Sequence, residues 1–179
     1  MFQYEYCRAE TPEEVCRFLR EYGPAGRIVA GGTDLMVQIR ERDKRWAGVS
    51  CLLDITPLET ALRYVRERDG ELDIGALCTH TDLERDRLIL EWLPFLAEAC
   101  AQVGSPQIRN RGTIGGSICN ASPAADPLTP LIAAGAKVRI LGASGTREAA
   151  LSEFYLGKGK IDLGPDEFVT SFRVKKLDP

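Results

Sequence analysis

Apolar positions near the N-terminus of the chain recur with the period of a helix. Val15, Phe18 and Tyr22 fall on one side of a helical projection, so this side should pack on a core. A capping box at 11–14 begins the predicted helix, and Gly23 ends it. The pattern therefore predicts a helix over 12–22.

Two short apolar runs follow, at 27–30 and 51–55, and each predicts a buried strand. The segment 35–40 between them predicts a helix. The charged connection after it carries Trp46, which we expect to be solvated. A cap signal at 56–59 then marks a new segment. We therefore predict an N-terminal lobe over 1–55 and a second lobe over 56–179.

The second lobe opens with a period of two instead of the helical period. Alternating residues over 62–78, interrupted by Asp69 and Gly70, predict a β-hairpin. Further along, the pattern predicts a capping box at 81–84, a helix from Leu93 to Gly104, a short helix over 128–134, strands over 137–141 and 168–174, and a helical turn over 151–155. This mixture predicts an α+β lobe with a mainly antiparallel sheet.

The segment from Gln107 to Asp126 is long, mostly small or polar, and flanked by the predicted helices. Gly115 and Gly116 lack a Cβ, so their backbone N–H groups could approach a ligand closely. Thr113, Ser117 and Asn120 add short hydrogen-bonding side chains. The segment favours an anionic or hydroxyl-rich ligand; the alternative is a glycine-rich loop that only joins two helices.

A second glycine pair, Gly31 and Gly32, follows the predicted strand 27–30 and precedes the predicted helix. A strand that runs through glycines into a helix directs unpaired N–H groups at one point, which suits phosphate. The Lys-Ser/Thr pair of a P-loop and the G-x-G-x-x-G of a Rossmann motif are both absent. We expect Asp34 to cap the following helix. A simple tight turn is the alternative.

Composition narrows the function further. The chain has 179 residues, a formal net charge of −3 and 27% charged residues, so nothing indicates nucleic acid or an anionic membrane as a partner. We find no signal peptide and no apolar run near the roughly 18 residues of a membrane span, and we expect a cytoplasmic protein.

The chain's six cysteines are scattered and there is one histidine, which argues against a metal centre and favours buried thiols, Cys119 included. The single histidine, His80, precedes the capping box at 81–84, and we expect it in a turn or at the surface. A general-base role would require a partner residue that the sequence does not identify.

The segments 30–35 and 107–126 together resemble the two FAD-binding motifs in the flavin subunits of molybdenum hydroxylases, such as xanthine dehydrogenase and carbon monoxide dehydrogenase. The similarity extends over nearly the whole chain. It implies the two-lobed α+β fold of the molybdopterin dehydrogenase and vanillyl-alcohol-oxidase-like FAD domains, with a small α/β lobe before a larger lobe. Family members continue for about a hundred residues, the scale of a small domain, beyond the position of Pro179. We therefore expect that domain to be absent here.

The resemblance also assigns residues to FAD, the implied cofactor. The loop that holds the diphosphate would comprise Ala30, Gly31, Gly32, Thr33, Asp34 and Leu35. A second segment near the phosphates would comprise Thr113, Gly115, Gly116 and Ser117, where the family often has Asn at position 117. Asp126 would accept from hydroxyl groups of the adenosine ribose, and Val169 would give an apolar contact.

The function that the resemblance implies is an oxidoreductase component without acid–base residues of its own. A molybdenum-cofactor subunit would oxidise the substrate, a [2Fe–2S] subunit would relay electrons to FAD, and NAD⁺ or another acceptor would receive them. The chain would then work in a hetero-oligomer. Two alternatives are an independent FAD-dependent reductase, resembling that of peptidoglycan precursor synthesis, and a scaffold or assembly module that has lost the cofactor.

Overall fold

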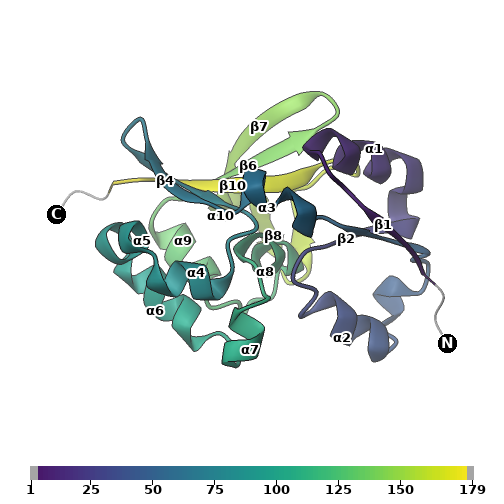
Figure 1. Cartoon of the computed structure of the whole chain (residues 1–179), viewed down its shortest axis with the longest axis horizontal. Coiled ribbons are helices and arrows are strands. Elements are labelled where there is room, and N and C mark those ends of the chain that lie inside the picture. Colours follow the sequence, from purple (N-terminus) through teal and green to yellow (C-terminus); the bar gives the residue numbers. More distant parts are fainter. Residues whose placement is uncertain (1–3, 177–179) are drawn as a thin grey trace.

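The computed structural model describes residues 4–176, and its helices and strands are drawn in Figure 1. The helices are α1 (Pro12–Tyr22), α2 (Leu35–Arg40), α3 (Glu59–Leu62), α4 (His80–Arg85), α5 (Arg87–Trp92), α6 (Pro94–Gln102), α7 (Pro106–Arg109), α8 (Ile114–Asn120), α9 (Leu128–Ala133) and α10 (Leu151–Phe154). The strands are β1 (Glu5–Arg8), β2 (Gly26–Val29), β3 (Cys51–Asp54), β4 (Val65–Arg68), β5 (Glu71–Gly75), β6 (Lys137–Gly142), β7 (Gly145–Ala150), β8 (Tyr155–Gly157), β9 (Lys160–Ile161) and β10 (Phe168–Lys175).

The N-terminal part of the chain forms a parallel three-stranded sheet in the order β1-β3-β2. Helix α1 connects β1 to β2 and confirms the predicted helix. The Thr11 side chain accepts from the Glu14 N–H, and Val15, Cys16 and Phe18 are buried. Strands β2 and β3 confirm the two predicted apolar strands, whereas β1 was not predicted.

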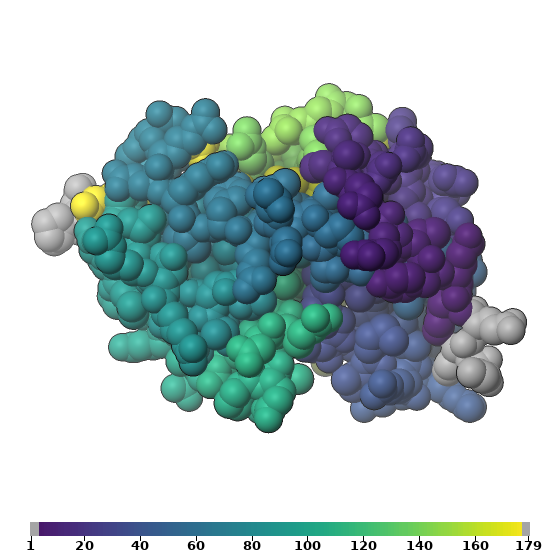
Figure 2. All heavy atoms as spheres, viewed as in Figure 1, coloured from purple at the N-terminus to yellow at the C-terminus, as the bar shows by residue number. Residues whose placement is uncertain are grey.

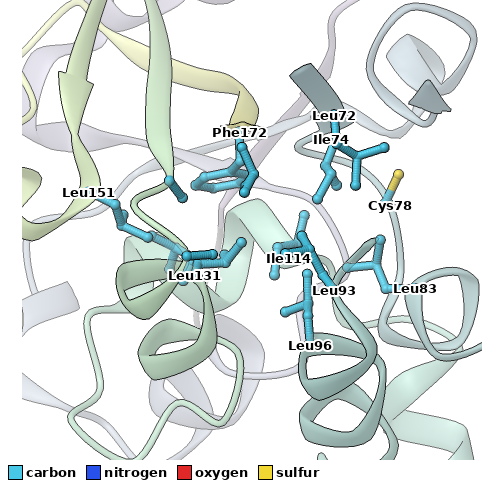
Figure 3. Packing of buried hydrophobic residues seen from close by; sticks show 14 of the residues in the cluster. Leu72, Ile74, Cys78, Leu83, Leu93, Leu96, Ile114, Leu131, Leu151 and Phe172 are labelled. Carbon is cyan, nitrogen blue, oxygen red and sulfur yellow. The ribbon is translucent and has the colours of Figure 1, made fainter. Parts of the chain in front are cut away.

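The second sheet has five strands in the order β4-β5-β10-β6-β7, and every neighbouring pair is antiparallel. Helices α4, α5, α6 and α9 cover one side of this sheet (Figure 1). In Figure 3, Leu72, Ile74 and Phe172 point from the strands toward Leu93, which joins α5 to α6, and Leu131 on α9. The predicted hairpin and final strand, and with them the α+β class, are confirmed.

The cores of the two parts meet beside the N-terminal sheet. Leu58, Leu62, Leu77 and Phe168, which follow residue 55, belong to the same buried cluster as α1 and β3. Figure 2 shows the purple-to-blue N-terminal part against the teal-to-green second part. The cap expected at 56–59 is replaced by a 3₁₀ turn, in which the Thr56 N–H donates to Asp54 Oδ1 at 2.8 Å. The lobe boundary near residue 56 stays a prediction.

The glycine-rich segment 107–126 is not one long loop, because α7 and α8 occupy much of it. The Thr113 hydroxyl accepts from the Gly116 N–H and caps α8. A Cβ at Gly115 would lie 2.8 Å from both Cβ and O of Ala76. Gly115 therefore allows α8 to pack directly on the residue that follows β5.

The capping box expected at 81–84 is formed by different residues. The Thr79 hydroxyl accepts from the Asp82 N–H at 3.1 Å, and the Asp82 carboxylate accepts from the Thr79 N–H at 2.8 Å. Helix α4 therefore begins at His80, which is 2% exposed. The expected turn or surface position of His80 is wrong, because the helix starts earlier than the sequence suggested.

Within residues 4–176, none of the helices is both long and apolar enough to cross a membrane.

Candidate functional site

A cavity of about 660 Å³ lies where the two parts of the chain meet. Its volume is within the range of roughly 300–1,000 Å³ that is common for small-molecule sites. The predicted site residues that line it are Ala30, Gly31, Gly32, Thr33, Asp34, Leu35, Thr113, Gly115, Gly116, Ser117 and Val169. Asp126 is exposed and is not among the lining residues. The fold therefore brings the two glycine motifs together.

The loop between β2 and α2 carries a row of unpaired donors. Within the described part of the chain, no protein acceptor bonds to the backbone N–H groups of Gly31, Gly32, Thr33 and Asp34. Gly32 has φ +72°, a left-handed conformation that glycine adopts without strain. At Gly31 a Cβ would overlap the carbonyl oxygen of Arg111. Both glycines are thus required by the shape of this loop.

Asp34 does not cap α2 as expected, since its side chain makes no capping hydrogen bond. Its backbone, at φ −93° and ψ −53°, is helical rather than extended, which turns the side chain away from the first helical N–H groups. The residue is exposed overall but lines the cavity, where desolvation raises the pKa of its carboxyl group.

Helix α8 forms the opposite wall, and its first N–H groups are already paired. Ile114 N donates to Cys78 O, Gly115 N to Ala76 O, and Gly116 N to the Thr113 hydroxyl. The expectation that Gly115 and Gly116 present free N–H groups is therefore wrong. At Gly116, which is exposed, a Cβ would have one near neighbour, Thr113 Oγ1 at 3.0 Å, so this position is less crowded than Gly115.

A network of side chains that the sequence did not predict lines the cavity. The Trp46 Nε1–H donates to Gln38 Oε1 at 2.9 Å, and Gln38 Nε2 donates to Asn120 Oδ1 at 3.1 Å, which links the two parts of the chain. The Arg27 guanidinium lies 5.2 Å from the Trp46 ring centroid, and burial lowers its pKa. Trp46 is half-buried in the cavity wall, so its predicted solvation is wrong.

His80 also lines the cavity. Burial lowers the pKa of its imidazole, the Asp126 carboxylate acts in the opposite direction, and the Arg109 guanidinium lowers the pKa further. The imidazole is therefore neutral at neutral pH. In the sequence, His80 could be noticed only as a polar residue just before a predicted helix. That position does not indicate that its side chain is buried.

The His, Cys, Asp and Glu side chains near the cavity do not favour a metal centre or a reactive thiol. Among residues 4–176, no group of three or more His, Cys, Asp or Glu side chains is arranged to hold a metal ion. Cys119 lines the cavity and packs against the core, and desolvation raises its pKa to about 12. Its thiol thus stays protonated at neutral pH, which agrees with a packing role.

A family model described as the FAD binding domain in molybdopterin dehydrogenase matches residues 2–175. The chain belongs to this family. Its cofactor is FAD, and the resemblance of the chain to the flavin subunits of molybdenum hydroxylases is confirmed. So is the two-lobed α+β fold.

Individual relatives agree with this assignment. The xanthine dehydrogenase FAD-binding subunit of Escherichia coli O157:H7 is 34% identical over 96% of this chain and 58% of its own length. The nicotinate dehydrogenase FAD-subunit of Eubacterium barkeri is 36% identical over 99% of this chain and 60% of its own. Carbon monoxide dehydrogenase from Hydrogenophaga pseudoflava has a TM-score of 0.93 at 31% identity, over 98% of this chain and 60% of that chain. The chain thus spans about three fifths of the relatives it matches.

Proposed function

We propose that this chain holds FAD in a molybdenum hydroxylase, where the flavin accepts electrons from the [2Fe–2S] clusters of a partner subunit. A molybdenum-cofactor subunit oxidises the substrate in this proposal, and NAD⁺ or another acceptor receives the electrons. The observation that carries the proposal is the row of unpaired N–H groups from Gly31 to Asp34 beside a cavity of about 660 Å³. FAD, when bound, supplies the redox chemistry.

The residues of the β2–α2 loop fit the diphosphate of FAD. Consecutive backbone N–H groups make a concave anion site, and each bond to a charged oxygen is stronger than a neutral one. The absence of side chains at Gly31 and Gly32 brings the backbone close to the ligand. Thr33 adds a hydroxyl to the same cavity wall. This loop, rather than α8, would provide the backbone contacts.

The other walls would orient the rest of the cofactor and exclude water from it. Val169 and Phe168 are buried at the start of β10 and line the cavity, as Leu77 does. These side chains provide the apolar surface that a flavin or adenine ring requires. On α8, Ser117 provides a short polar group for ribityl or ribose oxygens. Asp126 is not among the residues that line the cavity, and its assignment to the ribose stays a prediction.

The donor, the acceptor and the compartment remain part of the proposal. The named relatives are subunits of dehydrogenases, which supports work within a hetero-oligomer. We infer a cytoplasmic location, where a reducing environment would keep the six cysteines as free thiols. Reoxidation of the reduced, FAD-loaded protein by NAD⁺ in a stopped-flow instrument tests the acceptor. A flavin that stays reduced with NAD⁺ but is reoxidised by another acceptor would exclude NAD⁺.

The purified chain incubated with FAD tests the cofactor role. After removal of free flavin, we expect a yellow protein with one FAD per chain. Gly116→Leu, which adds a side chain at an exposed position of the cavity wall, should lose most of this flavin. Ala101→Leu is the matched control, because it places leucine at an exposed site of α6 outside the cavity. A colourless wild-type protein would instead favour a scaffold module.

A further inference from the structure

His80, the only histidine of the chain, is held rigidly in the cavity wall. Its backbone N–H donates to the Gly112 carbonyl at 3.1 Å, and Thr79 before it caps α4. The ring packs against Gly112, where a Cβ would lie 3.1 Å from His80 Cδ2. Backbone and ring are therefore both fixed, in a residue that is 2% exposed.

Neither ring nitrogen of His80 has a partner within residues 4–176. Nδ1 is fully buried and makes no hydrogen bond. Nε2 also makes none, but within residues 4–176 it is not one of the unpaired polar atoms that are fully buried, so it retains access to the cavity. Nε2 is thus the nitrogen that the cavity reaches. Buried polar side chains are nearly always hydrogen-bonded in folded proteins, so an unpaired imidazole in a ligand cavity indicates a ligand.

The surroundings of the ring determine which nitrogen carries the proton. A neutral imidazole has one N–H donor and one acceptor nitrogen. A proton on Nδ1 would bury an N–H group without an acceptor, whereas a proton on Nε2 leaves only a lone pair unpaired there. Nε2 is therefore the donor, and it faces the cavity.

We propose that Nε2 of His80 donates a hydrogen bond to an oxygen of bound FAD, which makes His80 a cofactor-contact residue. This inference rests on the proposed function. Thr79, the residue before His80, forms an isolated antiparallel β-bridge with Thr113, which caps α8. Gly31 lies against the backbone of Arg111, the neighbour of Gly112. The ring therefore stands beside both glycine motifs, where oxygens of the diphosphate or the adjoining sugars would be the acceptors.

A single histidine makes the test direct, because a ¹⁵N-histidine-labelled full-length chain gives one pair of ring resonances. We expect a protonated Nε2 before FAD is added, and a change of the Nε2 shift that saturates with flavin binding followed independently by fluorescence. Flavin binding that leaves both ring resonances unchanged overturns the contact but not the proposed function. If FAD does not bind at all, the proposed function fails and the contact fails with it.

Substitutions separate a cofactor contact from a structural role. His80→Leu should weaken FAD binding about five- to tenfold, the loss expected for one hydrogen bond. It should not lower the melting temperature of the apoprotein, since it removes an unpaired buried nitrogen. His80→Gln places an amide nitrogen near the Nε2 position and should keep the affinity within about threefold of wild type. A Leu variant that melts lower but binds FAD normally would assign His80 a structural role and refute the contact.

Discussion

Gly115 and Gly116 are neighbours in α8, yet the structure predicts opposite effects of an alanine at each position. At Gly115, a Cβ would lie 2.8 Å from Cβ and O of Ala76, and the backbone oxygen there cannot move aside easily. At Gly116 the nearest atom is the side-chain oxygen of Thr113 at 3.0 Å. The substitutions are chemically identical, so they separate packing from helix propensity.

The magnitudes follow from two opposing terms. Alanine in place of glycine favours a helix by about 1 kcal/mol. Overpacking a tight contact costs about 1–3 kcal/mol. Gly115→Ala should therefore lose a net free energy of unfolding of up to about 2 kcal/mol, which lowers the melting temperature by up to about 8 °C in a chain of this length. In Gly116→Ala the two terms roughly cancel or favour the variant, so the melting temperature should stay unchanged or rise.

Thermal unfolding of the two apoproteins, followed by circular dichroism, checks this contrast. Both variants are compared with wild type at the same protein concentration and without FAD, because a bound ligand adds its own stabilisation. If Gly116→Ala melts as low as Gly115→Ala, the close approach of α8 to Ala76 is not what requires glycine at position 115.

Two further predictions concern the cavity and the sheet. Gln38→Ala removes both hydrogen bonds of the link from Trp46 to Asn120; it should lower the free energy of unfolding by about 1–3 kcal/mol in urea titrations and weaken FAD binding. Unchanged values for both would show that the link is not formed in solution. The Arg147 guanidinium lowers the pKa of the Glu167 carboxyl, so the stability that this charge provides is full above the unfolded pKa and is lost as the pH falls through the folded pKa. Melting temperatures measured from pH 6 to pH 3 should thus fall less in Glu167→Gln than in wild type, and an equal fall would contradict this role.

Elements with a clear period were predictable from the sequence. Helix α1 has a capping box and one apolar side, and the hairpin of β4 and β5 has alternation around a turn. Strand β1 was missed because Glu5, Tyr6 and Arg8 are exposed, so its four residues show no apolar alternation. Its position depends on pairing with β3, a contact distant in sequence.

The site was predictable where backbone geometry determined it and less so where side chains from distant segments meet. The β2–α2 loop was predicted as a possible anion site because a strand that runs through glycines into a helix can direct unpaired N–H groups at one point, and the loop lines the cavity. The residues of helix α8 were predicted to lie in a loop, since glycine disfavours helices and the packing on Ala76 cannot be seen in sequence. Trp46 lies among charged residues, and its contacts with Arg27, Gln38 and the buried cluster around Ile39 cannot be seen in sequence. The ring of His80 packs against Gly112, and this contact between residues distant in sequence could not be predicted either.

The central claim is that the unpaired N–H groups of the β2–α2 loop hold FAD. Backbone amide NMR of the ¹⁵N-labelled chain during an FAD titration measures this directly, residue by residue. We predict that the amide protons of Gly31, Gly32 and Thr33 move downfield most and saturate at one equivalent of FAD, whereas the already paired amides of Gly115 and Gly116 move less. FAD binding that leaves the loop amides in place would contradict the claim.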